Sequence, residues 1–128
     1  MQDILEIFPQ ESLVLVKKLF AAPIPAKQEL LAEVDSYNAE IDEAASTRPD
    51  LDVNLAECIS LGCAALIEQL WDDASEQQRK LIQVACGYFI IEDDEAGDLN
   101  SVFGFDDDAA VFNVIAEYLD RDDLLIQV

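Results

Sequence analysis

Apolar residues recur every three or four positions along most of the chain, which is the period of an amphipathic α-helix. The first such segment runs from about Ser12 to Ala21 and is followed by two prolines, which end a helix. The next segment, AKQELLAEVDSYNAEIDEAAS, is longer and ends near Ser46, and acidic residues fill one of its faces. We expect its core-facing residues to be Leu30, Val34, Tyr37 and Ile41.

Capping patterns mark the starts of the next two helices. Asn54 with Glu57 and Ser75 with Gln78 each place an N-cap residue three positions before a Glu or Gln, which is the spacing of a capping box. The two helices follow each other across a short turn, so we expect them to be antiparallel neighbours. The sequence therefore predicts a helical hairpin at the centre of the fold.

Small residues lie within this hairpin at comparable distances from its turn. A glycine inside a helix costs roughly 1 kcal/mol relative to alanine, so Gly62 and Gly87 need a local reason. We expect them, with Cys63 and Cys86 beside them, to let the two backbones approach closely. The thiols are predicted to be small core residues, because no Lys, Arg or His nearby would favour a thiolate.

The last helix is predicted to start at the run Asp106–Asp108 and to continue past Tyr118. Apart from the short LLIQV near the end, no alternating pattern of apolar and polar residues competes with these helical periods. The length fits one domain that spans residues 1–128. The predicted fold class is all-α, with about five helices around the hairpin.

Charge narrows the range of partners. The chain carries 28 acidic and seven basic residues, a formal net charge of −21, yet 52 % of its residues are hydrophobic. This composition describes a compact acidic protein rather than a disordered tail. Because like charges repel, we expect neither nucleic acid nor anionic lipid among its partners, and no membrane association is predicted. A basic protein is the expected partner, and a homodimer that hides one apolar surface is left open.

The residues available for catalysis are limited. The chain has no histidine, which removes the Ser-His-Asp and Cys-His mechanisms and the common zinc sites. We therefore predict that the protein is not an enzyme. The opening MQDILEIF lacks the basic region of a signal peptide, and the three cysteines are an odd number. Both features favour a cytoplasmic protein with reduced thiols.

The most unusual stretch is YFIIEDDEAGDLNSVFGFDDDAAVF, which holds eight carboxylates and no Lys or Arg. It resembles the YkvA-like family (domain of unknown function 1232), whose signature runs roughly Y-x-x-S-P-x-D-x-x-P-D-x-x-P-x-x-G-x-x-D-D before an apolar helix. The resemblance covers residues 88–112 and needs no gap. The matching residues are Tyr88, Asp94, Asp98, Gly104, Asp107 and Asp108.

The stretch also departs from that signature. Its Ser-Pro pair is replaced by Ile91 and Glu92, and its later prolines are replaced by Gly97 and Ser101. The resemblance implies a small helical fold in which an Asp-rich link joins two packed helices. It implies no activity, because the family has no settled one.

The carboxylates of this stretch have several interpretations. Asp106–Asp108 precede a helix, where their side chains would cap free N–H groups and suit the positive helix end. The earlier acids lie at the C-terminal end of the preceding helix, where the helix dipole disfavours negative charge. They would therefore be a solvated turn or a docking face for a basic protein. The residues of this predicted docking face are Glu92, Asp93, Asp94, Glu95 and Asp98.

The alternative is a divalent cation held between the two sides of the link. Ca²⁺ and Mg²⁺ bind through carboxylate oxygens, but the ordered series of an EF-hand is absent. The candidate ligands are Asp94, Asp98, Asp107 and Asp108, and no other cofactor is expected. The same four residues would have to serve a carboxylate-only enzyme. The preferred prediction is a protein–protein interaction module, such as an adaptor, an inhibitor or an immunity-type partner, that presents a carboxylate-rich face to a basic protein.

Overall fold

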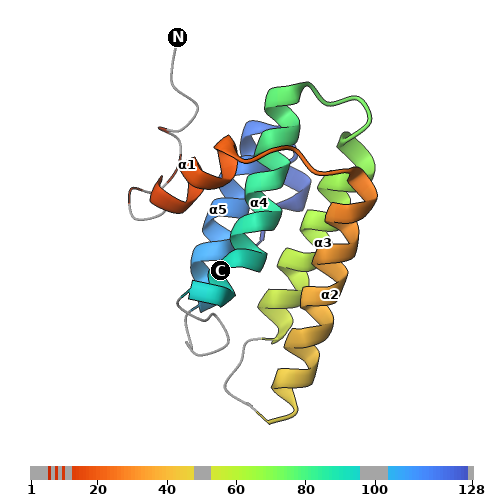
Figure 1. The fold of residues 1–128 in the computed structure, drawn as a ribbon, viewed down its shortest axis with the longest axis vertical. Coiled ribbons are helices and arrows are strands. Elements are labelled where there is room, and N and C mark those ends of the chain that lie inside the picture. Colours follow the sequence, from red (N-terminus) through yellow and green to blue (C-terminus); the bar gives the residue numbers. More distant parts are fainter. Residues whose placement is uncertain are drawn as a thin grey trace.

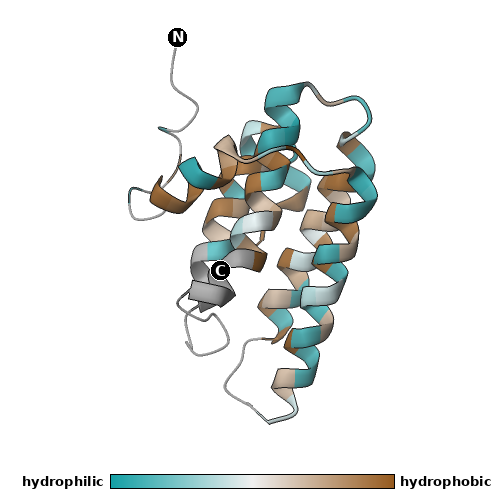
Figure 2. Ribbon diagram, viewed as in Figure 1, coloured by the Kyte–Doolittle hydropathy of each residue, from teal (hydrophilic) through white to brown (hydrophobic). Residues whose placement is uncertain are grey.

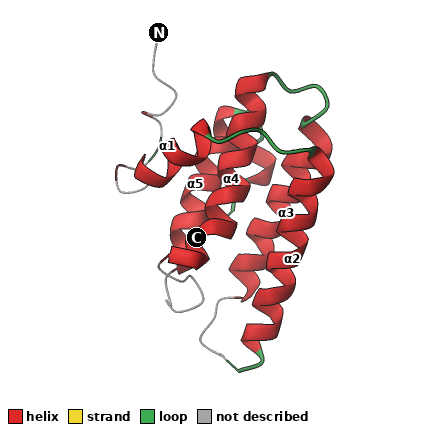
Figure 3. Ribbon diagram, viewed as in Figure 1, coloured by secondary structure: helices red, strands yellow, loops and turns green. Residues whose placement is uncertain are grey.

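The computed structural model describes residues 6, 8, 10, 13–47, 53–95 and 104–126, with the backbone alone for 91–95 and 104–107. Five α-helices occupy most of these residues, and no strand occurs among them (Figures 1 and 3). The helices are α1 (Leu13–Ala21), α2 (Lys27–Ala45), α3 (Val53–Leu70), α4 (Glu76–Glu95) and α5 (Gly104–Tyr118), followed by a short 3₁₀ turn, η4 (Asp122–Leu124). The predicted all-α class is confirmed.

The hairpin of α3 and α4 lies at the centre of the bundle. α2 and α5 each pack against both helices of the hairpin, and α1 crosses α4 (Figure 1). The largest fully buried side chains of the hairpin are Ile59, Leu66, Ile67, Leu81, Ile82 and Phe89. Burial of apolar area on this scale is the main stabilising term of a domain this size.

The predicted core face of α2 is confirmed. Leu30, Val34, Tyr37 and Ile41 are all buried, and the Tyr37 ring meets the Phe89 ring edge-on with centroids 4.9 Å apart. The acidic residues of α2 lie on its exposed flanks, which are the hydrophilic parts of the helix in Figure 2. The period of the sequence was sufficient to orient this helix.

The two predicted capping boxes have different outcomes. At the start of α4, the Ser75 N–H donates to Gln78 Oε1 at 2.8 Å and the Gln78 N–H donates to Ser75 Oγ at 3.1 Å, so this box is confirmed. α3 begins at Val53, which places Asn54 within the first turn rather than before it. The prediction that Asn54 is the N-cap of α3 is therefore wrong.

The two helical glycines do not face each other. A Cβ added to Gly62 would lie 2.5 Å from Cζ of Phe112 on α5, and one added to Gly87 would lie 2.8 Å from Cδ2 of Leu19 on α1. Each glycine therefore receives a large side chain from a third helix, which is a different reason for the glycine from the one that the sequence predicted.

The two core thiols do meet across the hairpin. Cys63 and Cys86 are fully buried, and their side chains share a hydrogen bond. That bond and burial raise the pKa of the Cys63 thiol well above its usual range. The prediction that both are core residues is confirmed.

α1 is held by its apolar face and by one side chain of α4. Val16 and Leu19 are buried, and Gln83 Nε2 donates to the carbonyl oxygens of Leu19 at 2.9 Å and Ala22 at 3.1 Å. Leu19 lies in the last turn of α1 and Ala22 directly follows it, where carbonyls lack partners from a continuing helix; Leu19 O also accepts from the Ala22 N–H at 3.2 Å. Gln83 therefore caps α1 from within the core.

One large apolar side chain of α3 is exposed. Leu61, at the centre of this helix, is 63 % exposed. In the part of the chain that the structure describes, α3 alone has the length and composition to cross a membrane, and 44 % of it is buried in the bundle. Core helices of soluble proteins have the same properties, so this is weak evidence for a membrane span.

Candidate protein-docking face

The acids that the sequence assigned to partner binding lie at the C-terminal end of α4. Glu92, Asp93, Asp94 and Glu95 form its last turn, where the negative end of the helix dipole disfavours them. Their side chains, and the whole of Asp98, lie outside the residues that the structure describes. Their role in partner binding stays a prediction.

The Asp run before the last helix lies inside that helix. α5 begins at Gly104, so Asp106, Asp107 and Asp108 follow its first residues instead of preceding the helix. The prediction that they are N-cap residues is wrong, although negative charge still suits this end of the helix. Asp108 is only 1 % exposed, which sets it apart from the solvated acids of the surface.

The predicted cation site involves residues on both sides of the link between α4 and α5. The side chains of Asp94, Asp98 and Asp107 are not described, which leaves Asp108 as the placed member of the set. Among the described side chains, no group of three or more His, Cys, Asp or Glu residues could hold a metal ion. The cation site at the link therefore stays a prediction.

A second acidic surface, which the sequence did not single out, lies where the α3–α4 turn meets the end of α5. We call it the acidic end. Its carboxylates are all exposed. They are Glu68, Asp72, Asp73, Glu76, Glu117, Asp120, Asp122 and Asp123.

Direct contacts join the two halves of the acidic end. Arg121 Nη2 donates to Gln69 Oε1 at 2.7 Å and thereby ties the segment after α5 to the last turn of α3. Asn113 exchanges two hydrogen bonds with the backbone of Ile126, at 2.9 and 2.7 Å, which holds the chain after η4 against α5. These hydrogen bonds hold the segments that carry the carboxylates of the acidic end in place.

The end of α5 has its own stop signal. Asp120 adopts a positive φ of 62°, the Arg121 N–H donates to Ala116 O at 2.8 Å, and the Asp120 N–H donates to Glu117 O at 3.1 Å. This pair of hydrogen bonds is a Schellman motif, which satisfies carbonyls of the last helical turn. Glycine is the common residue at the left-handed position, and Asp and Asn are among the side chains that tolerate it.

The basic residues near the acidic end are already engaged. Lys27 lies 3.2 Å from Asp72, and Arg121 lies 2.9 Å from Asp123. The bond to Arg121 lowers the pKa of Asp123, and the bond to Asp123 raises that of Arg121. The other carboxylates of the acidic end make no ion pair with a residue that the structure describes.

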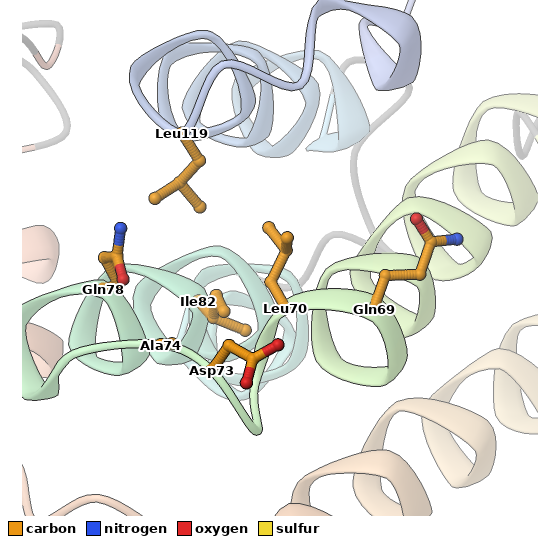
Figure 4. Close-up of a pocket in the computed structure, with 7 residues that line it drawn as sticks. All are labelled: Gln69, Leu70, Asp73, Ala74, Gln78, Ile82 and Leu119. Atoms are coloured by element: carbon orange, nitrogen blue, oxygen red, sulfur yellow. The ribbon is translucent and has the colours of Figure 1, made fainter.

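Apolar surface lies among these charges. Tyr118 is 48 % exposed and Leu125 is 41 % exposed. Between α4, the end of α3 and the end of α5 there is a pocket of about 190 Å³ (Figure 4). Ile82, which is fully buried, and the half-buried Leu70 and Leu119 supply its apolar lining. The acidic end thus combines a partly apolar pocket with exposed carboxylates.

The acidic end could not have been recognised as one surface from the sequence. Its two acidic segments, residues 68–76 and 117–123, are about 40 positions apart, and each alone is typical of a solvated turn. A weak signal was present, because both segments follow directly on strongly apolar helices.

Comparisons of this chain with protein-family models, with curated proteins and with solved structures found no match. The resemblance to the YkvA-like family over residues 88–112 therefore rests on its motif alone.

Proposed function

We propose that this protein is an interaction module that docks a basic protein through its acidic end. The observation that carries the proposal is a partly apolar pocket bordered by Asp73, on a surface whose other exposed carboxylates mostly make no ion pair with a described residue and whose Tyr118 is half exposed. Protein interfaces combine an apolar centre, in which aromatic residues are enriched, with a polar border. The proposal assigns no catalytic step to any residue.

Electrostatics supports a basic partner over other classes. The net charge of −21 repels nucleic acid and acidic proteins, and the nearby lysine and arginine side chains are bound within the fold. Complementary charge accelerates the encounter of two proteins and rejects partners of like charge. Association through this end should therefore weaken as the salt concentration rises.

The frame of the acidic end also favours binding. Its carboxylates lie on helix ends held by a capping box, a Schellman motif and the Arg121–Gln69 hydrogen bond. A surface that is already ordered loses little conformational entropy when it binds a partner. The acidic flanks of α2 are exposed too, but no residue of that helix lines the pocket at the acidic end.

Affinity capture from the source cell tests the proposal when two charge-matched variants are compared. In the first, Asp73→Asn, Glu117→Gln and Asp120→Asn remove three charges from the acidic end. In the control, Glu33→Gln, Glu40→Gln and Asp42→Asn remove three charges from exposed positions of α2. Captured proteins are identified by mass spectrometry, and the binding of each purified candidate is measured by calorimetry at low and high salt.

We expect a partner with a basic surface that binds the wild-type chain and the α2 variant and is lost by the acidic-end variant. Binding that survives in the acidic-end variant, or a partner whose affinity does not change with salt, would contradict the proposal. Both variants should keep the helical circular dichroism of the wild type, because the substituted side chains are exposed.

A further inference from the structure

We propose that the pocket of the acidic end is an anchor site for one arginine side chain of the partner. The inference rests on the proposed function and makes it more specific, because it names the group that enters the pocket. The pocket lies between the α3–α4 hairpin and the end of α5, and no residue of α2 lines it (Figure 4).

The size of the pocket fits a side chain. Its volume of about 190 Å³ exceeds the roughly 150 Å³ of an engineered cavity that accommodates benzene. It is smaller than the roughly 300–1,000 Å³ of sites that bind cofactors or drug-sized molecules. A long side chain of a partner is therefore a better fit than an independent cofactor.

The lining has two chemical parts. Figure 4 shows Leu70 and Leu119 extending toward the space between them, with Ile82 deeper in the pocket. These three side chains would contact the methylene groups of an entering residue. The polar part consists of Gln69, Asp73 and Gln78 at the border of the same space. Gln69 Oε1 already accepts a hydrogen bond from Arg121. An apolar stem with a polar head group matches this arrangement.

The charge of the pocket selects a cation. Asp73 is exposed and makes no ion pair with a described residue, whereas its neighbour Asp72 is bound by Lys27 at 3.2 Å. The two adjacent carboxylates of the turn thus have different roles, one on the α2 side and one at the pocket. Two helices also end beside the pocket, α3 at Leu70 and α5 at Tyr118. The negative ends of their dipoles attract a cation, whereas the positive end of α4, which begins at Glu76 and lines the pocket through Gln78, opposes it, so the preference for a cation rests on Asp73.

The acidic end already binds guanidinium groups of its own chain. Arg121 donates from Nε and Nη2 to the two carboxylate oxygens of Asp123, at 3.0 and 2.9 Å. Arg79 donates from Nε to Trp71 O at 2.9 Å and lies 5.5 Å from the Trp71 ring centroid. A planar guanidinium can pair with a carboxylate through two parallel hydrogen bonds, which an ammonium group cannot do. Asp73 offers the same kind of partner to an arginine from outside.

The test uses n-butylguanidinium as the probe and the full chain labelled at its methyl groups. Saturable NMR shifts are expected at Leu70, Ile82 and Leu119, with a dissociation constant in the millimolar range. n-Pentylammonium should bind more weakly, and n-butanol should give no saturable shift at the same methyl groups. The apolar stem is similar in all three probes, so the comparison isolates the head group.

Two variants and one control locate the site. Asp73→Asn should weaken the binding of n-butylguanidinium about five-fold, the upper range for a solvent-exposed ion pair. Ala74→Leu, a substitution at another lining position, should fill the pocket and abolish the methyl shifts. Asp42→Asn on α2 removes the same charge at a distance and should leave the affinity within two-fold of wild type.

Three results would overturn the anchor site. They are the absence of saturable shifts at the pocket, equal affinity for n-butylguanidinium and n-butanol, and equal loss of affinity in Asp73→Asn and Asp42→Asn. Tighter binding of n-pentylammonium than of n-butylguanidinium would overturn the assignment to arginine. None of these results decides whether a basic partner docks at the acidic end, because the capture experiment measures that docking separately.

Discussion

The contact between Gly62 and Phe112 gives the sharpest test of the packing. Gly62 lies in the middle of α3, and a Cβ at this position would lie 2.5, 2.9 and 3.1 Å from three ring atoms of Phe112. Phe112 is fully buried, so its ring has no free space into which it could move. The substitution Gly62→Ala therefore forces a shift of α5 relative to α3.

Two opposing terms set the size of the effect. Overpacking a well-packed core costs about 1–3 kcal/mol, and a contact this short with a rigid ring belongs at the upper end. Alanine regains about 1 kcal/mol over glycine through its helix propensity. We expect Gly62→Ala to lower the free energy of unfolding by about 1–2 kcal/mol, the difference between the two.

Gly87 provides the matched control. A Cβ at this position would lie 2.8 Å from Cδ2 of Leu19, which is the far end of a flexible side chain on a short helix. Leu19 can change its rotamer, so the packing cost should fall to about the size of the propensity gain. Gly87→Ala should therefore change the stability by less than about 0.5 kcal/mol, although the two initial contacts are similarly short.

Urea unfolding followed by circular dichroism measures both variants. For a chain of this length, a loss of 1–2 kcal/mol corresponds to a fall in Tm of roughly 3–10 °C. A double variant that adds Phe112→Leu should restore part of the stability lost in Gly62→Ala, because it removes the ring from the contact. A Gly62→Ala variant as stable as the wild type, or one as stable as Gly87→Ala, would refute this account of the glycines.

Three further predictions concern the cap of α1, the thiols and the cation site. Gln83→Glu should destabilise the fold at neutral pH by about 2 kcal/mol or more, because a buried carboxylate would replace the group that donates to two carbonyls. Urea unfolding at pH 4 and pH 7 measures this loss of stability. The loss should be smaller at pH 4, where the new acid is protonated. Native thiol labelling should modify the exposed Cys58 quickly and the buried Cys63 slowly. The free energy of unfolding should fall as the pH rises above the ordinary thiol pKa. The reason is that the pKa of Cys63 is raised in the folded chain, so the unfolded chain loses the thiol proton first. Calorimetric titration of the metal-stripped protein with Ca²⁺ and Mg²⁺ should give saturable binding that is lost in Asp94→Asn and Asp107→Asn if the link is a cation site, and no heat at millimolar metal would remove that alternative.

The elements of the fold could be predicted because their causes are local. The period of apolar residues identified the five helices, and the spacing of Ser75 and Gln78 fixed the start of α4. The contacts of the glycines could not be predicted in the same way. A glycine in a helix indicates that a bulky group lies close by, but the sequence does not say that the group comes from α5 or α1.

The candidate site shows the same division between local and tertiary information. The carboxylates of residues 88–112 are recognisable in the sequence because they lie close together along the chain. Those of the acidic end become neighbours only through the packing of α5 on the hairpin. The pocket between them requires Leu70 and Leu119 to face each other, although they are far apart in the sequence. The spacing of apolar residues within either segment does not predict that these two side chains meet.

The placement of the basic residues connects the fold with the proposed function. Lys27 and Arg121 pair with carboxylates of the acidic end, while Arg79 and Lys80 lie over the rings of Trp71 and Phe20. These cations are already bound to groups within the fold, so they compensate little of the negative charge on the other carboxylates. The uncompensated carboxylates repel one another and lower the stability of the free protein. A basic partner would relieve that repulsion when it binds, and part of its binding free energy would come from this relief rather than from new contacts.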